Sequence, residues 1–244
     1  MSVLKKSQDA QGRVMYDYYK GKQVSEIIER DDGYIDSSDG PKLYLSKYKD
    51  WSQHIKQAIR YVKGKVLDIG CGAGRHSLYL QNKGFDVLGI DTSPYALKVS
   101  RLRGLKKTKL ISANQLSSRN GKFDTILMLG NNFGLFESLK HGRRLLKIFN
   151  PITNDKAIII AETLDPYGTK EPYHTQYHRQ NRLRGKFGGE VRIRVRYQNY
   201  ISPWFNYWLA AKSEIQKLLD GTDWHVQKFI ESKGPIYIAI IVKR

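Results

Sequence analysis

The chain has 244 residues, of which 40% are hydrophobic, and this size suits one large α/β domain with insertions better than two small domains. Its formal net charge of +19 favours anionic substrates or polyanions as partners, although basic proteomes and thermophilic surfaces give such charges without a nucleic-acid partner. The only cysteine is Cys71, which excludes an internal disulfide. The amino terminus has no apolar core of signal-peptide length, and no run of about 18 apolar residues occurs anywhere. We therefore expect a soluble cytoplasmic protein.

Residues 1–62 are rich in acidic and aromatic side chains. Their pattern predicts helices over 16–28 and 43–62, separated by the polar loop 31–41, with Ser46 or Asp50 as a cap. We expect this helical lead-in to pack across the mouth of a binding site, with Tyr19 and Tyr48 as candidate substrate contacts. The alternative is that these tyrosines only tie the helices to the core.

Residues 65–91 read KVLDIGCGAGRHSLYLQNKGFDVLGID, the pattern of a strand, a Gly-rich turn, a helix and a second strand. In a parallel sheet such a turn lies at the carboxyl end of the first strand, where open α/β sheets bind ligands. Asp91 closes the second strand, and an acid there can accept both ribose hydroxyls of a nucleoside. The predicted ligand is an adenosine-containing cofactor.

Helices and apolar strands continue to alternate after this unit. We predict a helix over 94–102 with Ser93 as its N-cap, strands over 109–112, 123–129 and 157–162, and a helix over 141–149. A helix over 213–219 and strands over 224–230 and 236–242 complete the pattern. Apolar strands between helices are typical of a parallel sheet covered on both faces, so the sequence predicts a doubly wound α/β fold.

The region 165–210 breaks this alternation and is predicted to be a β-rich insertion. A loop over 166–190 precedes a strand over 191–197, and residues 199–209 are predicted to return as a second strand. Arg192, Arg194 and Arg196 share one strand face, which is either solvated or the electropositive wall of a pocket for an anionic substrate. Tyr197 and Trp204 are further candidate contacts of that pocket.

The glycine spacing separates two classes of nucleoside-binding fold. In Gly70-x-Gly72-x-Gly74, Arg75 stands where a dinucleotide fingerprint has its third glycine, and Asp68 precedes the turn. A pyrophosphate needs free amides at the helix start, whereas an acid before the turn suits a cationic ligand. S-adenosylmethionine is such a ligand, because it has no phosphate and bears a sulfonium and an ammonium group.

The run from Val66 to Arg75, together with Asp91, resembles the first two motifs of class I S-adenosylmethionine-dependent methyltransferases. The resemblance covers roughly residues 60–164 and 211–244, and it implies a seven-stranded sheet with an antiparallel final strand. It also implies S-adenosylmethionine as the cofactor, with its methionine part against the glycine turn and its ribose on Asp91. The implied cofactor residues are Asp68, Gly70, Cys71, Gly72, Gly74, Arg75, Asp91, Thr92, Ser93, Ala113, Asn114, Gly130 and Asn131.

Two positions differ from the common pattern of the family. Ser112 stands where an acid often faces the adenine amino group, so adenine recognition is expected from the Ala113 backbone or from Asn114. The segment 130–136, which the family usually places beside the transferable methyl, lacks the Asn-Pro-Pro-aromatic signature of base methylation. Asn131 is still able to orient a nucleophile, although it equally suits a turn. Phe133 is a candidate substrate contact.

Proton removal, if the reaction needs it, has few candidates in this sequence. Glu162, at the carboxyl end of the fifth strand, and His174 or His178 in the inserted region are the possible bases, so Asn131 and Glu162 are the candidate catalytic residues. The two histidines are four residues apart, but no third ligand is evident, and we expect no metal site.

The single cysteine lies in the cofactor turn, which argues against cysteine-based methylation of pyrimidine C5 and against radical chemistry on an iron–sulfur centre. The leading hypothesis is direct methyl transfer to an oxygen, nitrogen or sulfur of a small, potentially anionic molecule. The alternatives are an RNA methyltransferase, a non-catalytic S-adenosylmethionine-binding protein and, more remotely, a nicotinamide dehydrogenase. The expected organisation is a lead-in (1–62), a cofactor-binding core (63–164 and 211–244) and an inserted substrate cap (165–210), all in one domain.

Overall fold

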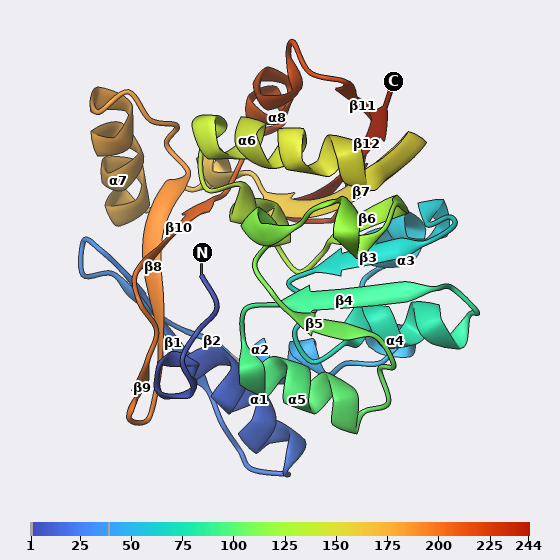
Figure 1. Cartoon of the computed structure of the whole chain (residues 1–244). Helices are drawn as coiled ribbons and strands as arrows, with labels where there is room; N and C mark the ends of the chain where they lie inside the picture. The colour runs from blue at the N-terminus through green and yellow to red at the C-terminus, as the bar shows by residue number, and fades with distance from the viewer. Residues whose placement is uncertain (1, 39) are drawn as a thin grey trace. The chain divides into compact units, whose positions relative to one another are not determined.

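A computed structural model of the chain describes residues 2–38 and 40–244 (Figure 1). Its internal contacts divide the chain into two compact units. The first unit comprises Met1–Trp51, Gly64–Leu116 and Ile193–Phe205, and the second comprises Ser52–Lys63, Ser117–Arg192 and Asn206–Arg244. No helix in the described residues has both the length and the apolar character of a membrane span.

Seven strands form one sheet in the order β11-β12-β7-β6-β3-β4-β5. The pairs β3–β4, β4–β5 and β6–β7 are parallel, whereas β12 is antiparallel to both β7 and β11. The predicted α/β class, with a mostly parallel seven-stranded sheet and an antiparallel final strand, is therefore confirmed. The strands are β3 (Val66–Ile69), β4 (Val87–Asp91), β5 (Thr108–Leu110), β6 (Phe123–Met128), β7 (Thr153–Leu164), β11 (Trp224–Glu231) and β12 (Ile236–Lys243).

In the first unit, α4 (Arg75–Asn82) follows β3 and α5 (Pro94–Leu102) follows β4. All four residues of β3 are buried, as expected for a strand that is covered on both faces. The helix α5 begins as predicted, because Pro94 lies in its first turn and the Ser93 hydroxyl accepts the Ala96 amide at 2.9 Å.

Residues 1–62 contain strands as well as helices, which corrects the predicted helix over 16–28. The helix α1 covers Ala10–Tyr19 and ends at Lys20, because Gly21 takes a left-handed φ of +85° just after it. Beyond it, β1 (Glu26–Arg30) pairs antiparallel with β2 (Ile35–Ser38) and with β8 (Glu190–Tyr197). These strands belong to a second sheet, of order β10-β8-β1-β2, with β9 paired to β8.

The single helix predicted over 43–62 is also wrong. Extended backbone at Lys47 and Trp51, with ψ values of 161° and 146°, interrupts it. The N-cap of the longest helical piece is Ser52, and neither Ser46 nor Asp50 takes that position. The pieces are α2 (Gly40–Tyr44), the 3-10 turn η2 (Tyr48–Asp50), α3 (Gln53–Ala58) and the 3-10 turn η3 (Ile59–Tyr61).

The inserted region holds a helix that the sequence did not indicate. The predicted loop 166–190 contains α7 (Pro172–Leu183), which begins with proline at its first position. The strand predicted over 191–197 is confirmed as β8. Residues 199–209 form two short strands, β9 (Tyr200–Ile201) and β10 (Phe205–Trp208), because Pro203 between them has no amide to pair.

In the second unit, α6 (Leu139–Phe149) and α8 (Lys212–Leu219) lie side by side (Figure 1). The central strand β7 is buried from Ala157 to Thr163, and its neighbour β12 is buried from Tyr237 to Ile241. Isoleucine and alanine make up most of both runs, which suits strands that are covered on both faces, and Glu162 is the buried acid among them.

The helix α1 is held against the start of α5 in the first unit, and the two lie side by side in Figure 1. One oxygen of the buried Asp9 carboxylate accepts the Gly12 amide at 3.0 Å, which caps α1. Its other oxygen accepts the Ser93 hydroxyl and the Tyr95 amide, both at 2.8 Å. Asp9 therefore fixes the N-terminal helix to the residues that follow Asp91.

We expect Gly12→Ala to destabilise the protein even though alanine favours helices by about 1 kcal/mol over glycine. A Cβ at Gly12 would lie 2.0 Å from the Ser93 hydroxyl oxygen and 2.5 Å from an Asp9 carboxylate oxygen. Overpacking of this kind costs roughly 1–3 kcal/mol. Chemical denaturation would measure the loss. Gly168→Ala is the matched control, because a Cβ there has open space around it. Equal stability of both variants and the wild type would contradict this packing.

Candidate functional site

The Gly-rich turn in the first unit leaves β3 through a left-handed backbone. Gly70, Gly72 and Gly74 have φ values of +70°, +53° and +80°, which only glycine adopts without strain. The amides of Gly70 and Cys71 both donate to the Ile90 carbonyl, at 2.9 and 3.0 Å. These bonds fix the turn beside the end of β4, where Asp91 lies.

Asp91 is the polar centre of this turn. Its two carboxylate oxygens accept the Gly72 amide at 2.8 Å and the Ser93 amide at 2.9 Å. Burial raises the pKa of Asp91 to about 6. An ionised carboxylate offers about four lone-pair positions, so these two bonds leave capacity for two more donors. The two hydroxyls of a ribose are such a pair, and the donor set therefore fits the ligand that the sequence predicted.

Asp68 lies one strand away from Asp91 and is also buried. Its carboxylate accepts the Ser77 hydroxyl at 2.6 Å, which ties β3 to α4. Burial, with a smaller contribution from the charge of Asp91, raises the pKa of Asp68 to about 6. Two acids held this close favour a ligand that carries positive charge.

The thiol of Cys71 has a packing role in the turn. A Cβ at Gly89 of β4 would lie 2.9 Å from the sulfur, so the side chain fills the space that this glycine leaves. Burial raises the pKa of Cys71 well above its usual value, which keeps the thiol protonated and unreactive.

Aromatic side chains surround the first turn of α4. Arg75 is buried, and its guanidinium lies 5.4 Å from the Trp51 ring. Tyr48, a predicted substrate contact, stacks on Tyr79 at 4.4 Å, and the Trp51 ring meets His76 edge-on at 4.8 Å. Burial lowers the pKa of His76 well below its usual value, so this histidine is neutral at physiological pH.

In the turn after β5, Ser112 occupies the position at which the class I methyltransferases often have an acid. Ser112 caps the 3-10 turn η4 (Ala113–Gln115), because its hydroxyl accepts the Asn114 amide at 3.3 Å. In return, the Gln115 side chain accepts the Ser112 amide at 3.0 Å. Ser112 is thereby used within the turn.

In the second unit, the buried Glu162 at the end of β7 holds the turn that follows β6. One carboxylate oxygen accepts the amides of Gly130 and Asn131, the latter at 3.3 Å. The other lies 3.1 Å from His54 Nε2, and both side chains of this pair are over 90% buried. Glu162 therefore has both oxygens occupied and acts as a clamp on the turn.

Asn131 lies at the centre of this clamped turn. Its backbone has a left-handed φ of +63°, and its carbonyl accepts the Tyr207 hydroxyl. Its side-chain Oδ1 is shielded from solvent and has no hydrogen-bond partner among the described residues. The carbonyl oxygen of an amide accepts up to two donors, so this atom is available to an N–H or O–H group of a ligand.

Tyr207 completes the cluster because Gly134 admits its ring. A Cβ at Gly134 would lie 2.2 Å from a ring carbon of Tyr207. Burial, with a smaller effect of Glu162, raises the pKa of Tyr207, so its hydroxyl remains a donor. The sequence indicated Asn131 and Glu162 but not His54, since no local spacing links residue 54 to residue 162.

The predicted substrate contacts of the first unit make specific interactions there. The Arg194 guanidinium binds both oxygens of Glu29 at 2.8 Å and lies 4.5 Å from the Trp204 ring. The Tyr197 hydroxyl donates to Asp17 at 3.1 Å. Arg194 is thus already neutralised by a carboxylate, which weakens the expectation of an electropositive wall.

The other two predicted contacts differ in burial. Tyr19 is 36% exposed at the end of α1. In the second unit, Phe133 is fully buried, with its ring 4.9 Å from Phe136 and 5.5 Å from Trp208. Phe133 therefore belongs to the hydrophobic core of that unit.

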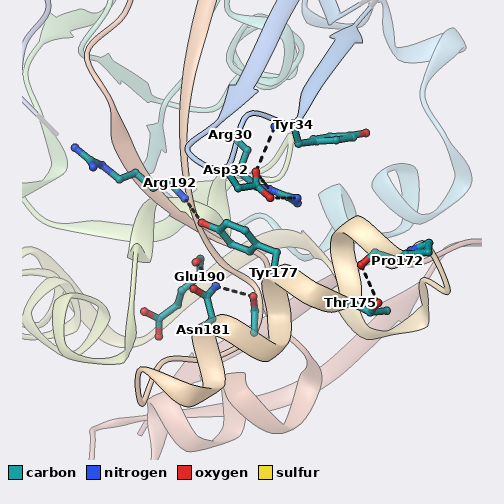
Figure 2. Close-up of polar contacts among 10 residues, drawn as sticks. Arg30, Asp32, Tyr34, Pro172, Thr175, Tyr177, Asn181, Glu190 and Arg192 are labelled. Atoms are coloured by element: carbon teal, nitrogen blue, oxygen red, sulfur yellow. Dashed lines mark hydrogen bonds and ion pairs between the residues drawn. The ribbon is translucent and has the colours of Figure 1, made fainter.

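The side chains of α7 attach this helix to β8, as Figure 2 shows. The Tyr177 hydroxyl accepts the Arg192 amide at 3.3 Å, and the Asn181 amide group donates to the Glu190 carbonyl at 2.7 Å. His178 is buried, and its ring meets Tyr167 edge-on at 5.5 Å. A core position of this kind accounts for the histidine without a metal.

The turn and the strands that follow it are similar to known proteins. Residues 66–150 match the family model described as "Methyltransferase domain". A glycine/sarcosine N-methyltransferase from Halorhodospira halochloris is 28% identical over 138 residues, which are 54% of this chain and 52% of that protein. Another, from Parasynechococcus marenigrum (strain WH8102), is 24% identical over 152 residues, 60% of this chain and 52% of that protein. The chain spans about half the length of these curated relatives.

A solved structure covers the whole chain. A SAM-dependent methyltransferase from Bacteroides fragilis, in complex with S-adenosyl-L-homocysteine, matches with a TM-score of 0.84 and 22% identity over 99% of this chain and 98% of its own. At this level of identity the match shows a shared fold.

Proposed function

We propose that the chain is an S-adenosylmethionine-dependent methyltransferase that transfers a methyl group to an amine nitrogen of a small molecule. The methyltransferase part is supported by the match of residues 66–150 to the family model. The observation that carries the methyl-donor part is the Asp91 carboxylate, with two backbone amides on it and capacity for two hydroxyls. The amine part rests on the glycine/sarcosine N-methyltransferases among the relatives.

The residues of the first unit would hold S-adenosylmethionine, which supplies a methyl group on a positively charged sulfur. Asp91 would bind the ribose hydroxyls, and the turn Gly70–Gly74 would lie along the methionine part. Asp68 would favour the positive charge from beneath the turn. Thr92, Ser93, Ala113 and Asn114 remain proposed contacts of the adenosine, and Arg75, Gly130 and Asn131 remain proposed contacts of the rest of the cofactor.

Asn131 would act on the acceptor. Its unpartnered Oδ1 would accept an N–H of the amine and so fix the direction of the nitrogen lone pair. The nitrogen forms the new bond to carbon as the carbon–sulfur bond breaks, and the sulfur keeps that electron pair. Glu162, with both oxygens occupied, would position Asn131 through the turn instead of removing a proton. Alignment of this kind supplies several kcal/mol of barrier reduction.

The assignment of a separate role to each segment of the chain remains part of the proposal. The core would be residues 63–164 and 211–244, with residues 1–62 as the lead-in and 165–210 as the substrate cap. Tyr19, Tyr48, Tyr197 and Trp204 are retained as proposed substrate contacts, whereas Arg194 is paired with Glu29 and Phe133 is a core residue.

Release of S-adenosylhomocysteine in the presence of different acceptors tests this function. We expect turnover with small amines such as glycine and sarcosine. Matched alcohols and thiols should be poor acceptors, and so should transfer RNA. Turnover confined to RNA, with binding that weakens steeply as salt rises, would replace the proposal by an RNA methyltransferase. Tight cofactor binding without turnover on any acceptor would indicate a binding protein.

The affinity for S-adenosylmethionine should depend on pH through Asp91. Burial raises its pKa to about 6 in the free protein, and the ribose hydroxyls require the ionised carboxylate. The binding free energy is therefore complete above pH 6 and is lost as the pH falls through this value. Below it, affinity should fall about tenfold per pH unit, and more steeply if Asp68 titrates as well. Calorimetry at pH 5 and pH 8 measures this, and Asp91→Asn should reduce the pH dependence.

A further inference from the structure

Glu26 is a buried acid that the proposed reaction has not used. It lies in β1 of the first unit, and its side chain is 0% exposed. The Tyr44 hydroxyl donates to its Oε1 at 2.6 Å. Its other oxygen, Oε2, is shielded from solvent and has no hydrogen-bond partner among the residues that the structure describes.

The surroundings of Oε1 are built closely around the carboxyl group. The Gln11 side chain of α1 donates to the Tyr44 hydroxyl at 3.1 Å, so a chain of donors runs from Gln11 through Tyr44 to Glu26. A Cβ at Gly40 would lie 2.3 Å from Oε1, so the start of α2 approaches the carboxyl as closely as glycine allows. Three elements, α1, α2 and β1, therefore meet at this acid.

The fold alone does not satisfy Oε2 in either protonation state. If Glu26 is ionised, Oε2 is a buried anionic oxygen that lacks a donor. If Glu26 is protonated on Oε2, a buried hydroxyl lacks an acceptor. Both arrangements carry a desolvation cost. A ligand with N–H groups and positive charge would remove it by stabilising the ionised form, in which Oε2 accepts a hydrogen bond.

Glu26 lies next to the side chains that cover the glycine turn. Its partner Tyr44 packs against the buried cluster of Met15, Ala73, Ala96 and Val99. Met15 in turn covers Gly72, where a Cβ would lie 3.5 Å from the Met15 methyl carbon. Tyr44, whose hydroxyl donates to Glu26, therefore packs against the same cluster that covers Gly72.

We propose that Glu26 Oε2 is the recognition site for the acceptor amine, which it binds in its ammonium form. This inference rests on the proposed methyl transfer to an amine and narrows it to a cationic acceptor group. It also reverses the expectation that the basic surface selects an anionic acceptor. The Tyr44 hydroxyl, itself held by Gln11, occupies Oε1, so Oε2 is the oxygen of Glu26 that binds the ammonium.

The same carboxyl can take the proton that the reaction must remove. An ammonium nitrogen has no lone pair, so one N–H bond must break before the nitrogen attacks the methyl carbon. Burial raises the pKa of Glu26 to about 7, which suits a group that accepts and returns protons at neutral pH. The proton passes from nitrogen to Oε2, the N–H electron pair remains on nitrogen, and the neutral amine is the nucleophile.

Glu26→Gln tests this role, because glutamine keeps the shape of the side chain and can still accept from Tyr44. We expect the KM for the amine to rise roughly 10- to 100-fold, the loss expected for one hydrogen bond to a charged group. The dissociation constant of S-adenosylmethionine should stay within threefold or so, as measured by calorimetry. Glu171→Gln is the matched control, because Glu171 is exposed just before α7. An unchanged KM for the amine in Glu26→Gln would overturn the proposal.

A second measurement on the wild-type protein does not depend on activity or on folding of the variant. Carboxyl carbon NMR of the labelled protein follows the titration of Glu26 with methylammonium chloride as the probe. Its pKa should fall when methylammonium is added, because a bound cation favours the carboxylate, and sodium chloride at equal ionic strength should have no such effect. Identical titrations in both salts would contradict the site. If no amine is methylated, the proposed function fails, and this titration alone decides the role of Glu26.

Discussion

Asp91→Ala is expected to abolish measurable binding of S-adenosylmethionine while leaving the protein folded. The substitution removes two proposed hydrogen bonds from ribose hydroxyls to a carboxylate, each worth about 1.5–3 kcal/mol, so the dissociation constant should rise by roughly a hundredfold or more. It also leaves the amides of Gly72 and Ser93 without their acceptor, which loosens the turn. Calorimetry with S-adenosylmethionine and with S-adenosylhomocysteine measures the effect.

The control for this substitution is Asp86→Ala, at the residue just before β4. Asp86 is an exposed acid that pairs with Lys107 at 2.7 Å, so its loss should leave cofactor affinity unchanged. Circular dichroism would establish that both variants are folded. Retention of wild-type affinity in Asp91→Ala would contradict the ribose assignment and, with it, the fit of the first unit to this cofactor.

Glu162→Gln is expected to lower kcat by roughly 10- to 100-fold. The NH2 group of the glutamine must take the place of one carboxylate oxygen, facing either the two backbone N–H groups or His54. The amide nitrogen is a donor, so it leaves the Gly130 and Asn131 amides without an acceptor when it faces them. When it faces His54, it forces the ring into the tautomer in which Nε2 accepts. The turn would then no longer hold Asn131 in place. Steady-state kinetics should show the loss in kcat, with the affinity for S-adenosylmethionine little changed.

Two further variants separate positioning from proton removal at Glu162. Asn131→Ala should lower kcat by a similar factor, since Asn131 Oδ1 is the atom proposed to contact the acceptor amine. Glu231→Gln should leave kcat unchanged, because Glu231 is exposed and pairs only with Lys212 among the described residues. A loss in Glu162→Gln that vanishes at high pH, while Asn131→Ala retains full activity, would show that Glu162 is a base instead of a clamp.

The glycine turn and the strands around it could be predicted because their signals are local. Strand β3, the three glycines and Asp91 lie within 26 consecutive residues, Val66–Asp91, and each position has its own chemical requirement. The start of α5 could be predicted equally well, since Ser93 caps the helix and Pro94 is its first residue.

The contacts of Glu162 in the second unit and of Glu26 in the first could not be predicted as well, because each set comes from distant segments. His54 reaches Glu162 across 108 residues, and Glu26 depends on Tyr44 and Gln11 from two other elements. The short run Glu26–Arg30 does not alternate regularly between apolar and polar residues, so its strand was predicted as helix. Pairing with β8, which lies more than 160 residues further along, decides its conformation.

The helix α7 was missed for a different reason. Its sequence is polar on almost every face, and only His178 and Asn181 are buried, so it shows no helical stripe of apolar residues. It is held by polar contacts to β8 and to the following loop, such as those of Asn181. Tertiary contacts of this kind leave no periodic signal in the sequence.

Transfer of an isotope-labelled methyl group is the direct test of whether the protein methylates an amine nitrogen. The wild-type protein is supplied with S-adenosylmethionine that carries ¹³C in its methyl group, together with sarcosine or glycine, and the product is followed by NMR. We expect the label to appear on the amine nitrogen, at a rate that rises with the concentration of the amine. Asp91→Ala should show no transfer. Label on a carboxylate oxygen, label on added RNA alone, or no transfer to any acceptor would contradict the proposal.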